Sequence, residues 1–586
     1  MKKTSALLAL CLFALASYSL RAAVNGYLVR NLVSDIPNLA DHTDPNLVGA
    51  WGISESGGSP FWIADAGSGL STLYSTNGSA IPVVVQIPGA GGSSTGIPTG
   101  TVYNATTGFE VAVGKPAAFL FDTLDGTISG WNPGVDRAHS VVKVDNSGVG
   151  ASYTGLAMGT SGSVTYLYAA NFHSGKIEVY NSSFTPVSLL NAFQDQMLPA
   201  GYSPFNVQNL GGNLYVAFAL QNASKSFAAG GPGTGYVDVF STSGVLMRRL
   251  VSQGPLNSPW GLAIAPATFG AFANDLLVGN FGDGTINAFD PSSGAFLGTV
   301  DDVLGTPVVI PGLWALRVGN GGSGGDPNAV YFTAGIPGPD NGSHGLFGRL
   351  ESAPQATTQN VVNGANSQGA IAPNTWIAIT GINLAGTTRA WNNGDIVNGA
   401  LPVVIDGVSV SINGAFAYVY YVSPTQLNAL TPAGLVPGAA QVQVNDNGLF
   451  SATVAIQVQA VAPSFFTNDG KHIQAFHADG SAVGTASPAT PAKPGETISL
   501  NGNGFGQTNP PIPDGKWVTS PAPVVTAPTI TVGGTAATVV SARLTSAGLY
   551  QITITVPSSA ADGDNAVIAQ VGGQTSPVNA VIAVQH

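Results

Sequence analysis

Short apolar runs separated by turn residues repeat between residues 46 and 352. The stretch 258–300 shows the pattern most clearly. Its four runs are residues 260–264, 276–279, 285–289 and 295–300. Apolar runs of strand length that are bounded by Gly, Pro and Asp predict β-strands. Four strands in about 40 residues are the unit of a β-propeller blade, so this pattern predicts a ring of blades.

Six such units follow one another, and a glycine precedes the third strand of each. The glycines are Gly69, Gly126, Gly175, Gly235, Gly284 and Gly345. Glycine suits a tight hairpin because it adopts positive φ without strain. The second unit is looser and is expected to begin with a strand at 108–113. The third is expected to end with a strand at 186–190.

The sixth unit has only three runs, whereas the apolar run 27–33 has no local partner. A ring must close, or its last blade leaves an exposed edge. We therefore expect residues 27–33 to form the outer strand of the sixth blade. The alternative is a free N-terminal strand that covers another surface.

Four of the units share a short motif in the first strand, and in three of them the motif begins with tryptophan. The motifs are Trp51-Gly52-Ile53, Trp260-Gly261-Leu262 and Trp314-Ala315-Leu316, with Thr154-Gly155-Leu156 as a variant. Small residues suit crowded inner strands, and the indole rings are expected to pack between blades. The alternative is that they line the mouth of a ligand site.

The pattern changes after residue 352. Residues 353–360 are expected to form a short polar linker. The segment 371–384 is echoed by 492–505, with Pro373 and Gly381 matched by Pro494 and Gly502. This duplication of alternating strands, without cysteine, predicts two Ig-like sandwiches.

The predicted fold class is all-β, a six-bladed β-propeller followed by two Ig-like β-sandwich domains. The expected parts are a signal peptide at 1–23, the propeller at 24–352 with its closing strand at 27–33, the linker at 353–360, and Ig-like domains at 361–462 and 463–586.

The first residues predict a secreted protein. Lys2 and Lys3 precede the apolar run 6–16, and small residues end near Ala23, which is the plan of a cleaved signal peptide. We expect the mature chain to be secreted, periplasmic or held at the cell surface. The only cysteine, Cys11, lies in this segment, and a lipoprotein acylated at Cys11 is the alternative interpretation.

The composition of the chain limits the kinds of partner that it is expected to bind. Charged residues make up 8% of the chain and the net charge is −12. The longest mature basic cluster is the pair Arg248-Arg249, so we expect no nucleic-acid binding. Beyond the signal no segment reaches the ~20 apolar residues of a membrane helix, so no membrane span is expected.

Two resemblances follow from these motifs. The W-G-[IL] strands, followed by F-W-I-A-D at 61–65 or L-L-V-G-N at 276–280, resemble NHL-type six-bladed propellers. Through Y-L-V-R-N-L-V-S-D at 27–35 and S-P-W-G-L-A at 258–263, the region 27–352 resembles a secreted bacterial propeller family that has no assigned activity. That resemblance implies fold and secretion only.

The C-terminal copies share P-x-x-x-I-x-[IL]-x-G-x-[NG]-[LF], which resembles TIG/IPT-type Ig-like modules over about residues 360–585. Such a resemblance implies a spacer or an adhesive stalk. The second copy departs from the pattern in its proline-rich loop 509–527.

Two groups of polar residues are candidates for a metal site. The first lies in the loop after the closing strand and consists of Asp35, Asp41, His42 and Asp44. The second ends the second strand of four units and consists of Asp65, Asp122, Asn171 and Asn280. Oxygen ligands of this kind suit Ca²⁺, the one cofactor that the sequence suggests. The alternative for both groups is that they cap turns and hairpins through backbone hydrogen bonds.

These observations favour a secreted, non-catalytic binding or adhesion protein. In this reading a ring face binds an extracellular glycan, peptide or protein and the tandem modules form a stalk. The alternative is a divalent-metal-dependent, lactonase-like propeller hydrolase or lyase, and a purely structural envelope protein is a third possibility. Carboxylates and histidine converging on the channel would favour the enzyme, whereas an exposed aromatic patch would favour binding.

Overall fold

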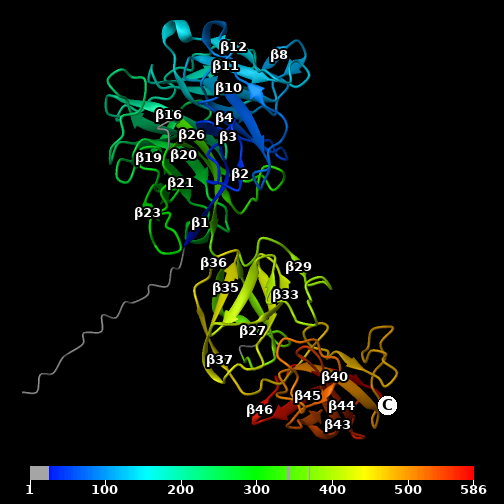
Figure 1. Cartoon of the computed structure of the whole chain (residues 1–586). Helices are drawn as coiled ribbons and strands as arrows, with labels where there is room; N and C mark the ends of the chain where they lie inside the picture. The colour runs from blue at the N-terminus through cyan, green and yellow to red at the C-terminus, as the bar shows by residue number, and fades with distance from the viewer. Residues whose placement is uncertain (1–25, 339–342, 368–369) are drawn as a thin grey trace, which may run out of the picture.

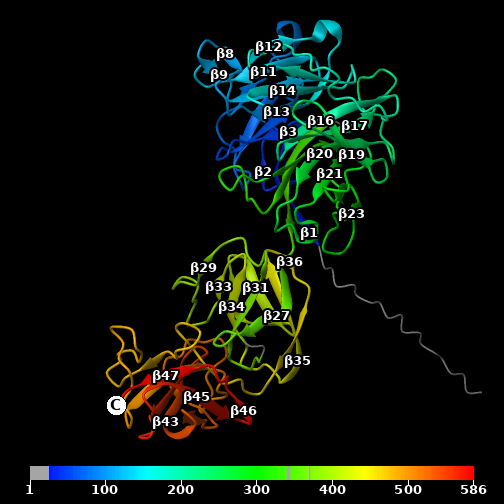
Figure 2. The same ribbon diagram turned by 180° about the vertical axis from the view of Figure 1, so that it is seen from behind.

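The computed structural model describes residues 26–338, 343–367 and 370–586. The expected signal peptide and Cys11 lie outside the described residues. The regular elements of the described residues are β-strands and three short 3₁₀ turns, and these residues include no α-helix. Figures 1 and 2 show three bodies in a row, with the blue-to-green part at one end and the red part at the other.

Residues 27–352 form six main sheets in chain order, antiparallel except for one short parallel pair at the edge of the sixth. The first contains β3 (Ala50–Ser54), β4 (Phe61–Asp65), β5 (Leu70–Tyr74) and β6 (Val85–Gln86). The second contains β7 (Pro98–Tyr103), β10 (Phe119–Thr123), β11 (Thr127–Trp131) and β12 (Val141–Asp145). The third contains β13 (Tyr153–Ser161), β14 (Val164–Asn171) and β15 (Lys176–Tyr180).

The next three sheets complete this part of the chain. The fourth contains β16 (Tyr202–Leu210), β17 (Asn213–Leu220), β18 (Tyr236–Phe240) and β19 (Leu246–Ser252). The fifth contains β20 (Pro259–Ile264), β21 (Leu276–Asn280), β22 (Ile286–Phe289) and β23 (Phe296–Thr299). The sixth contains β24 (Leu313–Val318), β25 (Val330–Pro337), β26 (Ser343–Ser352), β1 (Tyr27–Ser34) and β2 (His42–Thr43).

The first strands of the six sheets form a closed circle. Each of β3, β7, β13, β16, β20 and β24 contacts the next, and β24 contacts β3. Strand β1 pairs antiparallel with β26, from Tyr27 opposite Ser352 to Ser34 opposite Leu346. The segment 27–33 therefore adds to the sixth sheet beside β26.

Two details differ from the strands expected from sequence. The first strand of the second sheet is β7, whereas 110–116 form a small separate hairpin of β8 (Glu110–Ala112) and β9 (Lys115–Pro116). The third sheet has no fourth strand, because after Tyr180 only a single bridge to Pro186 forms. Leu190 there is 92% exposed, whereas Val187 and Leu189 are half-buried against the core beside the sheet without continuing the strand pairing.

Residues 355–458 form two facing sheets. One contains β27 (Gln355–Asn363), β28 (Trp376–Ile382), β34 (Gln426–Leu430), β33 (Tyr418–Val422) and β29 (Arg389–Ala390). The other contains β30 (Val404–Ile405), β31 (Val408–Ile412), β32 (Ala415–Phe416), β35 (Gly438–Asp446), β36 (Leu449–Phe450) and β37 (Val454–Val458). Alternate residues of both sheets, such as Ile377, Ile379, Val442 and Val444, meet in one buried core.

Residues 464–584 form a second, larger arrangement with its own core. Its strands are β38 (Ser464–Phe465), β39 (Ala475–Phe476), β40 (Thr497–Asn503), β41 (Ala522–Pro523), β42 (Thr529–Val532), β43 (Thr535–Ser546), β44 (Leu549–Thr555), β45 (Gly563–Val571), β46 (Gln574–Thr575) and β47 (Val581–Val584).

The three bodies are joined by short, hydrogen-bonded contacts. The stretch 353–360, expected as a linker, enters β27 at Gln355, which pairs with Ile382. Asn383 Nδ2 donates to the carbonyl oxygen of Thr268 at 2.7 Å. Trp376 Nε1 donates to the carbonyl oxygen of Ala547 at 2.8 Å and so ties the second body to the third.

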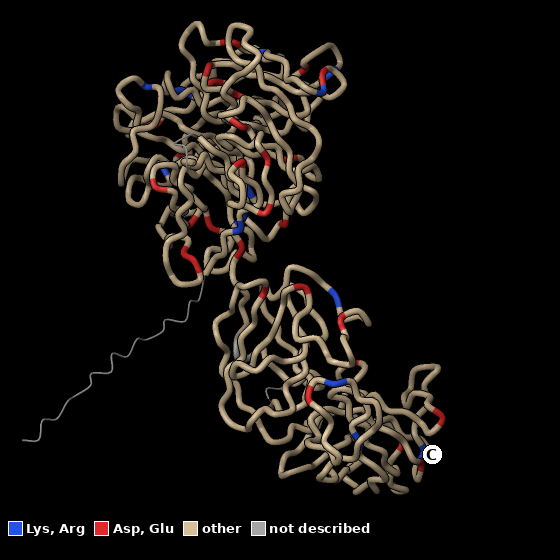
Figure 3. Tube along the Cα trace, viewed as in Figure 1, with Lys and Arg blue, Asp and Glu red and all other residues tan. Residues whose placement is uncertain are grey.

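Charges are sparse along the whole chain, and Figure 3 shows Asp, Glu, Lys and Arg scattered singly over all three bodies. Within the described ranges, no helix is long and apolar enough to cross a bilayer.

Candidate functional site

The four polar residues after β1 have separate partners. Asp35 accepts hydrogen bonds from His344 Nδ1 at 2.7 Å and from the Gly345 amide at 2.9 Å. Asp41 pairs with Arg30 at 2.8 Å, and His42 Nε2 contacts the carbonyl oxygen of Asn77 at 3.2 Å. Each of these side chains thus fixes the loop to a different neighbour.

Asp44 is the member of this group that reaches inward. One of its oxygens accepts the Asn46 amide at 2.9 Å, and the other accepts the Tyr74 hydroxyl at 2.9 Å. In the ranges that the structure describes, no three His, Cys, Asp or Glu side chains lie close enough together to hold a metal ion. Each polar side chain of the loop has a hydrogen bond or an ion pair of its own in this structure.

The second group occupies buried strand ends with different hydrogen bonding. Asn171 accepts the Ser174 amide at 3.1 Å and donates to Glu178 at 2.7 Å. Asn280 accepts the Asn257 amide at 3.0 Å and donates to the Pro255 carbonyl oxygen at 2.8 Å. These amide side chains satisfy backbone groups of the neighbouring loops.

Asp65 differs from the others because it is fully buried at the end of β4 and neither carboxylate oxygen has a hydrogen-bond partner. Burial raises the pKa of Asp65 well above its usual range. The neighbouring Thr72 lowers this pKa in part, whereas the negative charges of Asp44 and Asp35 raise it further. The structure therefore brings Asp65 within electrostatic reach of two acidic residues of the first group.

Asp122 ends the corresponding part of β10 and is also fully buried. Its Oδ1 accepts the Thr99 hydroxyl at 2.8 Å and the Gly100 amide at 2.5 Å, while Oδ2 has no partner. Burial raises the pKa of Asp122 to about 6, although both hydrogen bonds favour the charged form.

Replacing Asp122 by asparagine should therefore flatten the pH dependence of stability between about pH 4 and pH 6. The folded protein binds this proton more tightly than the unfolded chain does, so the carboxyl lowers the free energy of unfolding as pH rises through that window. The urea midpoint should be measured at pH 4 and pH 7. Asp283→Asn, at an exposed hairpin, is the control, and a wild-type difference that Asp122→Asn leaves unchanged would contradict the assignment.

The centre of the strand circle is filled by aromatic side chains. Trp51 and Trp314 stack with ring centroids 3.6 Å apart, and each is 4% exposed. Trp260 Nε1 donates to the Thr154 carbonyl oxygen at 2.8 Å, and Asn206 Nδ2 donates to the Trp260 carbonyl oxygen at 2.8 Å. The tryptophans of the first-strand motifs are thus packed between neighbouring first strands, and the Trp260 indole is also hydrogen-bonded there, whereas the buried Trp51 Nε1 has no hydrogen-bond partner among the described residues.

Two partly exposed phenylalanines cover this buried cluster on the side of the hairpins that follow the second strands. Phe281, directly after β21, stacks on Trp314 with centroids 4.1 Å apart. Phe227 lies edge-on to Phe281 at 5.4 Å and to Trp51 at 6.1 Å. Leu124 packs against the same cluster and is also partly exposed. Phe227 and Phe281 lie against each other and form a small apolar patch, here called the central patch.

The sequence alone did not reveal the central patch. Phe227 comes from the loop 221–235 between β17 and β18, where it lies among serine, alanine and glycine in a stretch typical of a surface turn. The available signal was the length of this connection, because long connections inside compact domains are often functional. The phenylalanine after the second strand is a weaker signal, since Phe172 occupies the equivalent place in the third sheet and is buried.

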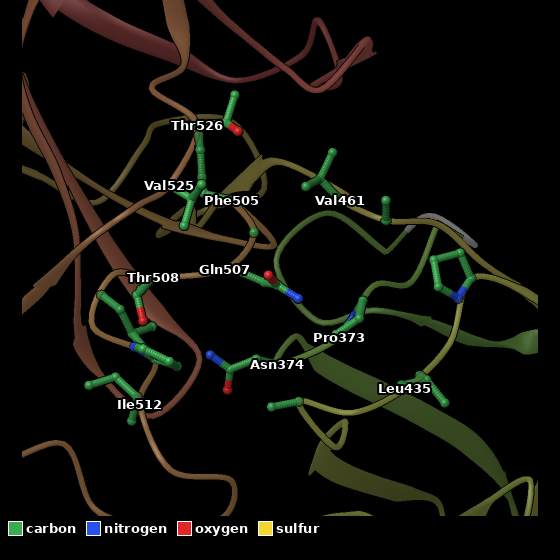
Figure 4. A pocket seen from close by; sticks show the side chains of 16 residues that line it. Pro373, Asn374, Leu435, Val461, Phe505, Gln507, Thr508, Ile512, Val525 and Thr526 are labelled. Carbon is green, nitrogen blue, oxygen red and sulfur yellow. The ribbon is translucent and has the colours of Figure 1, made fainter.

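A separate cleft of about 540 Å³ opens where the second and third bodies meet. Figure 4 shows Asn374 and Gln507 in the middle of this cleft, with Val461, Phe505 and Ile512 around them. Its lining contains no charged side chain within the described residues. This composition suits an uncharged ligand or ordered water more than an ion.

No protein-family model matches the chain. Uncharacterized protein R648 of Acanthamoeba polyphaga mimivirus is 33% identical over 337 residues, which are 56% of this chain and 81% of the relative. Uncharacterized protein L690 of the same virus is 32% identical over 339 residues, covering 56% of this chain and 87% of the relative.

Among solved structures, a streptogramin B lyase aligns over 56% of this chain and 99% of its own, with a TM-score of 0.34 and 10% identity. A likeness at this level carries no information on the activity of this chain.

These relatives correct the resemblance drawn from sequence. The expected bacterial family with TIG/IPT-type modules is wrong as a family assignment, because the matching relatives are viral and no family model supports the modules. The short motifs W-G-[IL] and P-x-x-x-I are not specific enough to identify a lineage. The chain belongs to the family of uncharacterized proteins that includes R648 and L690 of Acanthamoeba polyphaga mimivirus.

Proposed function

We propose that this chain is a secreted, non-catalytic binding or adhesion protein that captures an extracellular partner on the central patch. Residues 24–352 would form a six-bladed β-propeller, and residues 361–462 and 463–586 would form two Ig-like sandwiches that act as a stalk. The signal-like segment 1–23 supports secretion. The circle of first strands and the pairing of β1 with β26 support the propeller.

The central patch is the observation that carries this proposal. Phe227 and Phe281 keep part of their rings in solvent although buried indole rings are available beneath them. Exposed aromatic groups that lie on a rigid, well-packed base are typical of binding surfaces, because little side-chain entropy is lost when a partner covers them. An apolar or aromatic side chain of a peptide or protein fits this surface best.

The two separately packed bodies, residues 355–458 and residues 464–584, support the stalk. Each has its own apolar core, and the bodies follow one another in a row (Figure 1). Such an arrangement holds the circle of strands away from the opposite end of the molecule. A stalk of this kind suits an adhesion protein whose binding face must reach a partner.

Arrays of peptides and glycans probed with labelled protein of residues 24–586 test the proposal. Wild-type protein should bind a subset of peptides, and Phe227→Ser with Phe281→Ser should weaken that binding about tenfold or more, since central aromatic anchors dominate such interfaces. Phe296→Ser and Phe416→Ser are matched controls at phenylalanines that are 50% and 54% exposed elsewhere. If the double variant unfolds, the single variant Phe227→Ser is used to test peptide binding instead. Peptide binding that survives loss of Phe227 would refute the central patch as the site.

A further inference from the structure

A second groove lies on the contact between residues 355–458 and 464–584, and it has a different chemistry from the central patch. Its volume is about 410 Å³. Three aromatic side chains form one wall, namely Trp376 of β28, Trp391 after β29 and Tyr420 of β33. Three amides, Asn428, Gln474 and Asn501, line the remainder with small and apolar residues. We call this feature the aromatic–amide groove.

The aromatic wall is built as a box of edge-on rings. The Trp391 and Tyr420 centroids are 5.0 Å apart with the rings at 83°. Trp376 lies 5.8 Å from Trp391 and 5.7 Å from Tyr420, at 64° and 65°. The Trp376 indole is anchored by its hydrogen bond to the Ala547 carbonyl oxygen, and the Trp391 amide donates to the Tyr420 carbonyl oxygen at 2.8 Å. The rings therefore support one another, and they remain partly exposed, with Tyr420 at 39% and both tryptophans half-buried.

The polar groups of the groove are largely unused within the protein. Four side-chain groups of the groove have no hydrogen-bond partner among the described residues. They are the amides of Gln474 and Asn501, the Nε1 of Trp391 and the hydroxyl of Tyr420. Asn428 uses only its oxygen, which accepts Gln426 Nε2 at 2.8 Å. Gln474 and Asn501 are partly buried. Amides that pair with nothing inside the protein are available to a ligand that both donates and accepts hydrogen bonds.

Among the described residues, the lining of the groove includes no Asp, Glu, Lys, Arg or His and so carries no charge. An ionic ligand such as a phosphate or an acidic peptide would find no counter-charge here. A neutral ligand with an apolar face and a rim of hydroxyl groups matches both the exposed rings and the free amides. Sugars have this character, since the C–H face of a pyranose packs on an aromatic ring while its hydroxyls donate and accept hydrogen bonds.

We propose that the aromatic–amide groove binds a neutral oligosaccharide. The aromatic rings would hold one or two sugar units through their C–H faces, and Asn428, Gln474 and Asn501 would bind their hydroxyls. The site is independent of the central patch. Trp391 and Tyr420 belong to the second body and Gln474 and Asn501 to the third, so a bound sugar would also clamp these bodies together.

Titration calorimetry of protein comprising residues 24–586 with cellohexaose, xylohexaose, maltohexaose and chitohexaose tests this inference. At least one of these sugars should bind with a Kd of about 10⁻⁵ to 10⁻³ M and raise the melting temperature of the protein. Trp391→Ala and Tyr420→Ala should each weaken binding about tenfold or more. Asn501→Ala should weaken it by a smaller factor, because one hydrogen bond among several is lost.

Two controls separate the sugar site from other effects. Trp517→Ala removes an indole that is 46% exposed outside the groove, and it should leave sugar binding unchanged. Phe227→Ser should also leave it unchanged, so failure of the peptide experiment and failure of this one are distinguishable. The inference is overturned if no sugar of the panel binds at about 10 mM. It is also overturned if Trp391→Ala and Tyr420→Ala melt like wild type and bind the sugar as tightly as wild type does. A third contradicting result is that these two variants weaken the binding of array peptides but not the binding of any sugar.

Discussion

Val33→Asp should lower the free energy of unfolding of the 27–352 body by about 4 kcal/mol or more, or prevent its folding. Val33 is 0% exposed and lies opposite Phe347 in the pairing of β1 with β26. It packs in the same core as Leu47, Phe61 and Tyr74. An aspartate there would lose the apolar contacts and bury a charge without a partner.

Hydrogen-exchange mass spectrometry is the best measurement, because it reports on each sheet separately in a chain of several bodies. Amides of β25 and β26 should lose protection in Val33→Asp, whereas those of β40 and β44 should keep theirs. Arg30→Ser is the control on the same strand. Its side chain is 50% exposed and pairs with Asp41 at the surface, so its removal should cost less than about 1 kcal/mol. Unchanged protection of β26 in Val33→Asp would mean that β1 does not close the sixth sheet in solution.

Trp314→Ala should destabilise the same body by about 3–5 kcal/mol. Trp314 is 4% exposed, and its ring contacts Trp51, Phe281 and Trp260. Removing the indole leaves a cavity at the centre of the circle of first strands, which neighbouring sheets cannot fill without breaking their pairing.

The effect of Trp314→Ala is measured by urea denaturation followed by circular dichroism, and the near-ultraviolet signal of the packed aromatic rings should also weaken. Trp517→Ala is matched in chemistry but removes a half-exposed ring, and it should change stability by less than about 1 kcal/mol. A similar midpoint for the two alanine variants would show that the aromatic cluster is not a packing centre.

The sequence predicted most strands of this fold because their apolar runs are short and bounded by turns. It failed for β7, and Gly100 explains why. A Cβ at Gly100 would lie 2.6 Å from the Leu156 amide nitrogen and 2.7 Å from Asp122 Oδ1. The strand needs glycine for close packing, yet Pro98 and Gly100 in sequence are typical of a turn. The apolar run at 108–113 therefore looked like the better strand.

The candidate site was predicted less well than the fold. The strand-end residues Asp65 and Asp122 could be located, because a polar residue after an apolar run is visible in the sequence. Their burial and shared surroundings depend on contacts with other sheets and other loops, as the influence of Asp44 on Asp65 shows. Phe227 was missed because an isolated aromatic residue in a polar loop has no periodic pattern.

The pairing of β1 with β26 sets the order of events when the chain is made. The two strands are separated by about three hundred residues, so β1 leaves the ribosome long before its partner exists. At about 5–20 residues per second the wait lasts tens of seconds. Until Ser352 has emerged, the first strand stays without its neighbour. The sixth sheet is therefore completed only after the strands of the other five sheets have emerged, and the pairing of β1 with β26 is the last step in closing the circle.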